Sequence, residues 1–213
     1  MNRASATSTT TVLIAAALVS ALSGCSLTVT PPSTEPSTSS STTPPAEAET
    51  PTETVEPVAL SIPECDALLT LDQARSVLDA PTAELLPAEP ANAYTPWYYD
   101  ATVVSALSGL TVARSCWWGV PNSGYGFTVV VGEIDPATRS SLEATLIANG
   151  SSEAVLGART VYAIEDDEAD TAESHEFIGD VWILSNGPDL DITGIAADYA
   201  YEAMLTANPD LGR

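Results

Sequence analysis

The sequence predicts an α+β domain, in which an antiparallel sheet of about four or more strands carries helices packed on one face. Short apolar, β-branched runs in the second half of the chain are typical of strands. Helix-capping sequences separate these runs, and the order strand-strand-helix occurs twice. Turn sequences lie between consecutive strands, so neighbouring strands can pair as hairpins.

The first elements of this domain are expected to be helices. Residues 70–73 have the pattern of a capping box, which predicts a helix over residues 70–78 that ends before Pro81. An irregular, proline-rich stretch follows. Residues 97–107 then favour a second helix, because a glycine stands just beyond them, where a helix commonly ends.

Two strands and a helix come next. Residues 110–118 (LTVARSCWW) and 127–134 (FTVVVGEI) predict strands, and the turn sequence PNSGYG joins them. Asp135 is a favourable N-cap and Pro136 fits the first helical position. A helix is therefore expected to run from there to Ala148, where Asn-Gly ends it.

The same order of elements recurs in the last third of the chain. Residues 154–164 and 176–185 predict strands, and residues 165–175 predict an acidic loop between them. Residues 195–207 predict a closing helix, with Pro209 beyond its end. The two halves share negligible sequence similarity, so the recurrence is not interpreted as a duplication.

The start of the chain resembles a bacterial lipoprotein signal peptide. A short polar segment precedes an apolar run, Thr11 to Leu22, which is too short to span about 30 Å of hydrocarbon. The run ends in Leu22-Ser23-Gly24-Cys25, the pattern of a lipobox. This resemblance implies cleavage after residues 1–24 and lipidation of Cys25 with chains such as palmitate. The expected location is the extracytoplasmic face of the cell membrane, with the lipid as anchor.

Residues 25–60 carry the lipidated cysteine and a stretch dominated by Ser, Thr, Pro and Glu. Such a composition buries too little apolar surface to offset chain entropy, so a disordered tether is expected. Residues 61–213 remain, a length that suits a single globular domain with a core of its own.

The charge of the chain restricts its partners. Its formal net charge is −23, with 29 acidic residues against six arginines, and lysine is absent. A surface of this sign repels phosphate backbones, which argues against nucleic acid, and it disfavours lying flat on anionic lipid. Apart from the membrane reached through the lipid, the expected partner is an envelope protein, a glycan or a small ligand.

Cys65 and Cys116 are the two cysteines left after Cys25, and an even pair in an oxidising compartment predicts a disulfide. A zinc site of the usual kind needs more Cys and His ligands than one histidine and no Cys-x-x-Cys can provide. We therefore expect no metal and no cofactor.

His175 is the candidate for acid–base chemistry because it is the single histidine and is flanked by carboxylates in Glu173-Ser174-His175-Glu176. It could serve a secreted hydrolase, but the Gly-x-Ser-x-Gly elbow of many such enzymes is absent. The favoured interpretation places His175 in a solvated loop.

Seven carboxylates around residues 165–176 could collect cations, since calcium prefers several oxygen ligands. However, the spacing of an EF-hand loop is absent, and carboxylates in a hairpin loop are usually hydrated. Weak cation binding therefore stays an open alternative for Glu165, Asp166, Asp167, Glu168, Asp170, Glu173 and Glu176.

The strongest candidate for ligand binding is an aromatic cluster in the proline-broken segment: Tyr94, Trp97, Tyr98 and Tyr99. Aromatic faces provide stacking area at low entropic cost, and their polar tips suit sugars or peptides. The alternative is that these rings cover the sheet or the disulfide as part of the core.

Residues 65–70 (CDALLT) and the Cys-x-Trp of residues 116–118 resemble small actinobacterial lipoproteins whose globular domain has no assigned function. They are also loosely similar to extracytoplasmic sensor domains of mycobacterial serine/threonine kinases. The resemblance implies a disulfide-tied α+β domain without catalytic activity. The sequence therefore favours a lipid-anchored binding or accessory domain. The alternatives are an envelope hydrolase using His175 or a carboxylate pair, and a spacer or surface antigen without a ligand.

Overall fold

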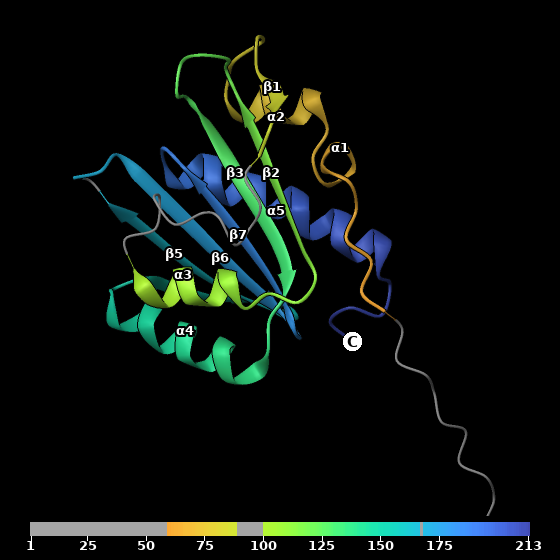
Figure 1. The fold of residues 1–213 in the computed structure, drawn as a ribbon, viewed down its shortest axis with the longest axis vertical. Coiled ribbons are helices and arrows are strands. Elements are labelled where there is room, and N and C mark those ends of the chain that lie inside the picture. Colours follow the sequence, from red (N-terminus) through yellow and green to blue (C-terminus); the bar gives the residue numbers. More distant parts are fainter. Residues whose placement is uncertain (1–58, 89–99, 167) are drawn as a thin grey trace, which may run out of the picture. The chain divides into compact units, whose positions relative to one another are not determined.

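The computed structural model describes residues 59–88, 100–166 and 168–213. This part of the chain has the expected α+β class: a seven-stranded antiparallel sheet with helices packed against it (Figure 1). The sheet order is β1-β2-β3-β7-β6-β5-β4, and all neighbours are antiparallel. The strands are β1 (Glu84–Leu86), β2 (Ala113–Gly119), β3 (Gly126–Glu133), β4 (Ser152–Leu156), β5 (Arg159–Asp166), β6 (Thr171–Ile178) and β7 (Val181–Gly187).

The helices expected at residues 70–78 and from Pro136 begin at the capping residues that the sequence identifies. The closing helix begins at Leu190, five residues before its expected start at residue 195. Thr70 forms the expected capping box with Gln73. Asp135 accepts hydrogen bonds from two backbone N–H groups of the first turn that follows it, and Pro136 occupies the expected first position. The helices are α1 (Cys65–Leu68), α2 (Leu71–Val77), α3 (Ala101–Ser108), α4 (Pro136–Ala148) and α5 (Leu190–Ala207).

Helices cover both faces of the sheet, whereas the sequence predicts them on one face. One core lies between the sheet and α1, α2 and α5, and it contains Val129 and Val131 of β3. The other lies between the sheet and α3 and α4, and it contains Val130. Successive side chains of a strand point to opposite faces, so an unbroken apolar run such as β3 buries both of its faces.

The last four strands differ from the two that the sequence predicts. The expected strand 154–164 is divided at Gly157, and the expected strand 176–185 is divided at Gly179. Both glycines have positive φ values, 67° and 55°, which permit tight turns between paired strands. The second half of the domain therefore contains four strands before its helix, and much of the expected acidic loop belongs to β5 and β6.

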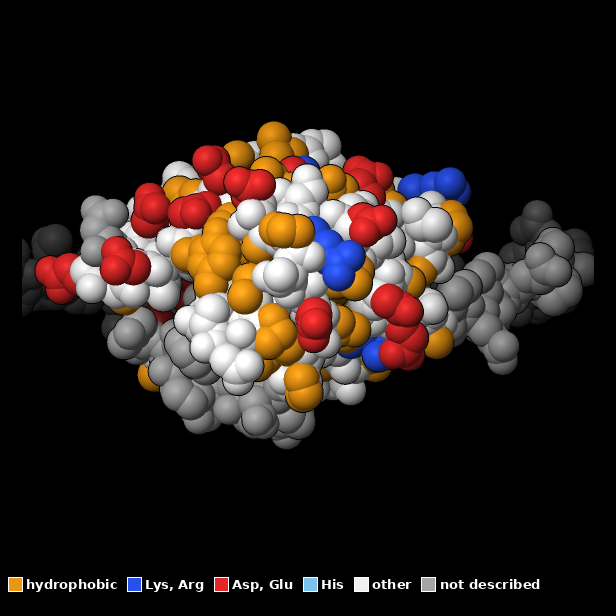
Figure 2. Space-filling view, turned by 90° about the horizontal axis from the view of Figure 1, so that it is seen from above, with side chains coloured by type: hydrophobic (Ala, Val, Ile, Leu, Met, Phe, Trp, Pro, Cys, Tyr) orange, Lys and Arg blue, Asp and Glu red, His pale blue; other side chains and the backbone are white. Residues whose placement is uncertain are grey.

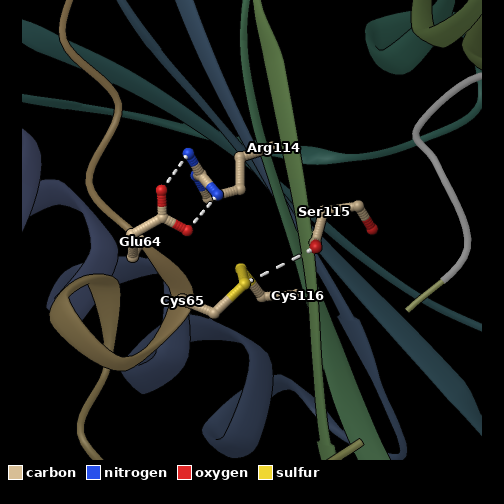
Figure 3. Close-up of a disulfide and its surroundings, with 5 residues drawn as sticks. All are labelled: Glu64, Cys65, Arg114, Ser115 and Cys116. Carbon is tan, nitrogen blue, oxygen red and sulfur yellow. Dashed lines mark hydrogen bonds and ion pairs between the residues drawn. A yellow bond between two sulfur atoms is a disulfide. The ribbon is translucent and has the colours of Figure 1, made fainter. Parts of the chain in front are cut away.

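The disulfide between Cys65 and Cys116 is confirmed, with 5.6 Å between the two Cα atoms. It joins α1 to β2 (Figure 3). Cys116 is fully buried. Beside it, Arg114 donates two hydrogen bonds to the carboxylate of Glu64, one of them at 2.9 Å. The first described segment is thus fixed to the sheet both covalently and by an ion pair.

None of the helices in the described part of the chain is long and apolar enough to cross a membrane.

Candidate functional site

A groove of about 180 Å³ lies between the sheet and the first half of α5. We call it the α5 groove. Most of the side chains around it are apolar, and its polar groups come from β6 and α5. Its lining consists of Leu156, Val161, Ala163, Ser174, Glu176, Leu190, Gly194 and Asp198.

The register of the sheet brings the polar groups of β6 into the α5 groove. Ser174 and Glu176 are two residues apart, so both point to the face that α5 covers. Opposite them on β5 stand Ala163 and Val161, which are small or β-branched. These neighbours leave space above the two polar side chains and surround them with apolar atoms.

One stripe of α5 forms the other wall of the groove. Leu190, Gly194 and Asp198 recur every four residues and therefore share a helix face. A Cβ atom added to Gly194 would meet no atom within 4 Å, so the missing side chain helps to keep the groove open. Glycine in a helix interior costs about 1 kcal/mol relative to alanine. The helix is therefore less stable with glycine than with alanine at position 194, which lines the groove.

Glu176 and Arg159 form an ion pair at the base of the groove, with 2.7 Å between Oε2 and Nη1. Arg159 also donates to Asp198 across 2.6 Å, and its guanidinium lies over the ring of Tyr201 at 4.2 Å. The side chains of Glu176 and Arg159 are only 3% and 12% exposed, whereas that of Asp198 is 58% exposed. The cluster connects β5, β6 and α5.

Burial raises the pKa of Glu176 to about 7, although the charge and hydrogen bond of Arg159 act in the opposite direction. The nearby carboxylate of Asp198 adds to the increase. Glu176 is therefore a carboxyl group that can gain or lose a proton near neutral pH. A strongly perturbed carboxyl that lines a groove is a recognised indicator of a functional site.

Two buried polar groups of the α5 groove have unused hydrogen-bonding capacity. Glu176 uses Oε2 for Arg159, and no other described residue donates to its carboxylate. Ser174 is 2% exposed, and its hydroxyl makes no hydrogen bond with the described residues. Beside Ser174, on β7, the hydroxyl of Ser185 is fully enclosed and has no partner among the described residues. Buried polar groups are normally satisfied, so this floor is suited to a ligand with hydrogen-bond donors.

His175 does not lie in a solvated loop, so that interpretation is wrong. It belongs to β6, where it pairs with Tyr162 on β5 and Leu184 on β7, and its side chain is fully buried. Its Nε2 is 2.9 Å from Oε2 of Glu173, and its ring stacks on Trp182 with 5.8 Å between centroids. The ring is inaccessible because apolar neighbours on both adjacent strands enclose it.

The carboxylates of the acidic run do not converge. Glu165 and Asp166 end β5, and Glu173 and Glu176 point to opposite faces of β6 because they are three residues apart. Asp167 lies outside the described residues. Over residues 59–88, 100–166 and 168–213, the structure places no group of three or more His, Cys, Asp or Glu side chains that could hold a metal ion.

Two other hollows are less suited to selective binding. One of about 120 Å³ lies beside Asp100 and Glu173 on the opposite face of the sheet, and both carboxylates already accept hydrogen bonds. A larger one of about 500 Å³ lies near Leu60 and Leu211. Of its acidic residues, Asp180 and Asp210 are exposed and Glu133 is half-buried. Neither combines apolar walls with polar side chains of such low exposure that keep unused hydrogen-bonding atoms, as the α5 groove does.

The remaining predicted site residues cannot be placed. Cys25 and the aromatic cluster of Tyr94, Trp97, Tyr98 and Tyr99 lie outside the described residues. Of the sites named from sequence, the structure therefore places the disulfide, His175 and most of the acidic run.

Ser174, Glu176 and Gly194 could not be identified from the sequence as residues that line one groove. Gly194 was not recognised because the closing helix was expected to begin at residue 195, whereas α5 begins at Leu190 and contains it. Asp189, which caps α5, was the signal that could have corrected this boundary. The two residues of β6 carried a weaker signal: polar side chains that directly precede the apolar run FIGDVWIL. Their convergence depends on β5 and α5 and is not visible in the local sequence.

Comparisons with known proteins give no family assignment. No family model matches the chain, and no curated protein matches it. A crystal structure of a GTP-binding regulator from Thermotoga maritima is similar over 65% of this chain and 89% of that one. Its sequence identity is 12% and the TM-score is 0.36, which is too low to support an argument about fold or function.

Proposed function

We propose that this chain is a lipid-anchored, non-catalytic binding domain on the extracytoplasmic face of a bacterial cell membrane, and that the α5 groove is its ligand site. The observation that carries the proposal is the floor of that groove. Ser174 and Glu176 are buried there with unused hydrogen-bonding atoms, inside largely apolar walls. Apolar pockets with a few convergent polar groups are typical of small-molecule sites.

The proposed location is supported by the sequence and by the disulfide. The lipobox ending in Cys25 and the Ser/Thr/Pro-rich tether suit an anchored ectodomain. The disulfide of Cys65 and Cys116 agrees with an oxidising compartment, where such bonds persist.

The geometry around His175 favours binding over hydrolysis. Ser174 and His175 are consecutive in β6, so their side chains point to opposite faces and cannot form a nucleophile–base pair. The imidazole is buried and hydrogen-bonded to Glu173, away from the α5 groove. Within the groove, the carboxylates of Glu176 and Asp198 are both ion-paired with Arg159.

Fractionation of cells that express the full chain tests the anchor. The wild-type protein should sediment with membranes, and its Cys25-containing peptide should carry the mass of a diacylglycerol. A Cys25→Ala variant should appear in the soluble fraction. Equal membrane association of both proteins, with an unmodified sulfur, would contradict the proposed anchor.

Binding of small aromatic probes to the full-length chain tests the site. Benzyl alcohol, benzoate and benzylamine share one ring and differ in the polar group that would meet Ser174 and Glu176. At least one of them should bind the wild type and lose affinity in a Gly194→Leu variant, whose side chain fills the groove. Failure of all three probes, or binding that Gly194→Leu leaves unchanged, would favour the spacer interpretation.

A further inference from the structure

We infer that the α5 groove selects a small organic cation, a primary ammonium group attached to a compact apolar body. This inference rests on the proposed function of the groove and specifies the chemical class of its ligand. It follows from the donor–acceptor balance of the floor, the volume of the groove and the charge of the domain.

The polar atoms available in the groove are predominantly acceptors. Glu176 presents a carboxylate oxygen without a hydrogen bond, Asp198 adds a second carboxylate, and the hydroxyl of Ser174 can accept as well as donate. Two acceptors on the same face of β6 suit a donor with several N–H groups. A carboxylate ligand would face like charges on Glu176 and Asp198.

Arg159, the nearest cation, does not change the predominance of hydrogen-bond acceptors in the groove. Arg159 directs Nη1 to Glu176 and Nη2 to Asp198, and its guanidinium face rests on Tyr201. When Glu176 is ionised, two carboxylates share this one guanidinium, so the cluster carries a net negative charge. A ligand ammonium would restore neutrality in surroundings where charge interactions are stronger than in water.

The volume of the α5 groove limits the size of the apolar part of the ligand. The groove measures about 180 Å³. An apolar cavity of about 150 Å³ accommodates benzene, so a single ring or a short branched chain fits here beside the ammonium group. Val161, Leu156 and Leu190 supply the apolar contacts for such a body.

The electrostatic field of the protein also favours a cationic ligand. The chain has a formal charge of −23 and no lysine. On the face shown in Figure 2, acidic side chains are widely distributed and basic side chains are few. A surface of this sign raises the local concentration of cations and lowers that of anions.

Protonation of Glu176 should be coupled to binding, because only the ionised carboxyl attracts the ammonium. The charged groups that face Glu176 are Arg159 from β5 and Asp198 from α5, while its neighbour on β7 is Ile183. The pKa of Glu176 in the free protein is about 7. Affinity should therefore fall by up to about tenfold for each pH unit below that value and level off above it.

Isothermal titration calorimetry of the full-length chain in phosphatidylcholine vesicles, with empty vesicles as the blank, tests this inference. Benzylamine should bind at least about tenfold more tightly than benzyl alcohol, and benzoate should not bind. Benzyltrimethylammonium has the same charge but no N–H donor, so it should also bind at least about tenfold more weakly. The factor of ten corresponds to one lost charge-assisted hydrogen bond.

Glu176→Gln keeps an acceptor for Arg159 but removes the charge, so it should abolish both the preference for benzylamine and the pH dependence. Glu202→Gln, on an exposed position of α5, is the matched control and should leave both unchanged. If Glu176→Gln does not fold, Asp198→Asn should still weaken benzylamine relative to benzyl alcohol. A groove that binds benzyl alcohol or benzoate as tightly as benzylamine overturns this inference and leaves the proposed function intact. A groove that binds none of the probes overturns both.

Discussion

Arg159 and Glu176 form an ion pair on adjacent strands with 2.7 Å between Nη1 and Oε2, and both side chains are almost completely withdrawn from water. Burial of such a pair is costly unless further contacts compensate the charges. Arg159 obtains these contacts from Asp198 and Tyr201, whereas the described residues provide Glu176 with no second hydrogen bond. Because Glu176 has fewer compensating contacts than Arg159, it is the member of the pair that is more easily neutralised.

Replacing Glu176 should therefore remove a pH-dependent part of the stability. The folded-state pKa is raised from 4.5 to about 7, so the native protein binds this proton more tightly than the unfolded chain does. The contribution is fully present below pH 4.5 and is lost as the pH rises through about 7. A shift of this size corresponds to about 3 kcal/mol.

Urea unfolding of the wild type and Glu176→Gln at a series of pH values measures this effect. The free-energy difference between wild type and variant should decrease by about 3 kcal/mol between about pH 4.5 and about pH 8. Glu202→Gln should show no comparable trend. A constant difference for Glu176→Gln across this range would mean that burial does not raise the pKa.

Gly194→Ala should stabilise the domain by about 1 kcal/mol, because alanine has the higher helix propensity and its Cβ meets no other atom. Gly157→Ala is the informative contrast. Gly157 also has open space around it, but its φ of 67° strains any residue with a Cβ, so this variant should lose about 1 kcal/mol. Thermal unfolding of both variants tests the pair, and destabilisation by Gly194→Ala would show that the helix is crowded at this position.

Removing the disulfide should be strongly destabilising. Cys65 and Cys116 are 51 residues apart, and the chain-entropy model gives about 4 kcal/mol for a loop of this length. Urea unfolding with and without dithiothreitol, repeated on a Cys65→Ser/Cys116→Ser variant, measures the loss. Reductant should have no further effect on the double variant. Equal midpoints for the oxidised and reduced wild type would show that the bridge does not limit stability.

Two adjacent tryptophans of β2 should differ in their importance for stability. Trp118 is 1% exposed and stacks on Phe127 with 5.4 Å between ring centroids, whereas Trp117 points to the opposite face and is only half-buried. Trp118→Ala should cost about 4 kcal/mol because it leaves a large cavity in the core. Trp117→Ala should cost less than half as much in the same unfolding experiment. Similar losses would mean that both faces of β2 are equally packed.

The elements that could be predicted from sequence depend on contacts within a few residues. The capping box at Thr70 and the N-cap at Asp135 are local hydrogen-bond patterns, and they correctly mark α2 and α4. The β2–β3 hairpin was recognisable because a glycine-containing turn separates two apolar runs.

The second half of the sheet was harder to predict because its turns are short. Gly157 and Gly179 reverse the chain within segments that resemble single strands. Charged residues such as Glu173 and Glu176 suggested an exposed loop, but their partners lie on other elements. Arg159, which pairs with Glu176, is 17 residues away in the sequence and becomes its neighbour only through strand pairing.

The α5 groove could not be predicted for the same reason. It needs the alignment of Ser174 and Glu176 with the small side chains of β5, and it needs Gly194 to lie above them. Sequence patterns identify which residues share a face, but the depth of a groove depends on the packing of elements against one another.

Ser61 is tied to Asn208 by two hydrogen bonds of 2.8 Å, and four residues later Cys65 is bonded to β2. This arrangement has a mechanical consequence. Tension applied to the chain before residue 61 would break these two hydrogen bonds and then the Glu64–Arg114 ion pair before it reached a covalent crosslink, which transmits the load directly to the sheet. Only residues 61–64 could peel away, so α1 and α2 are shielded from unravelling.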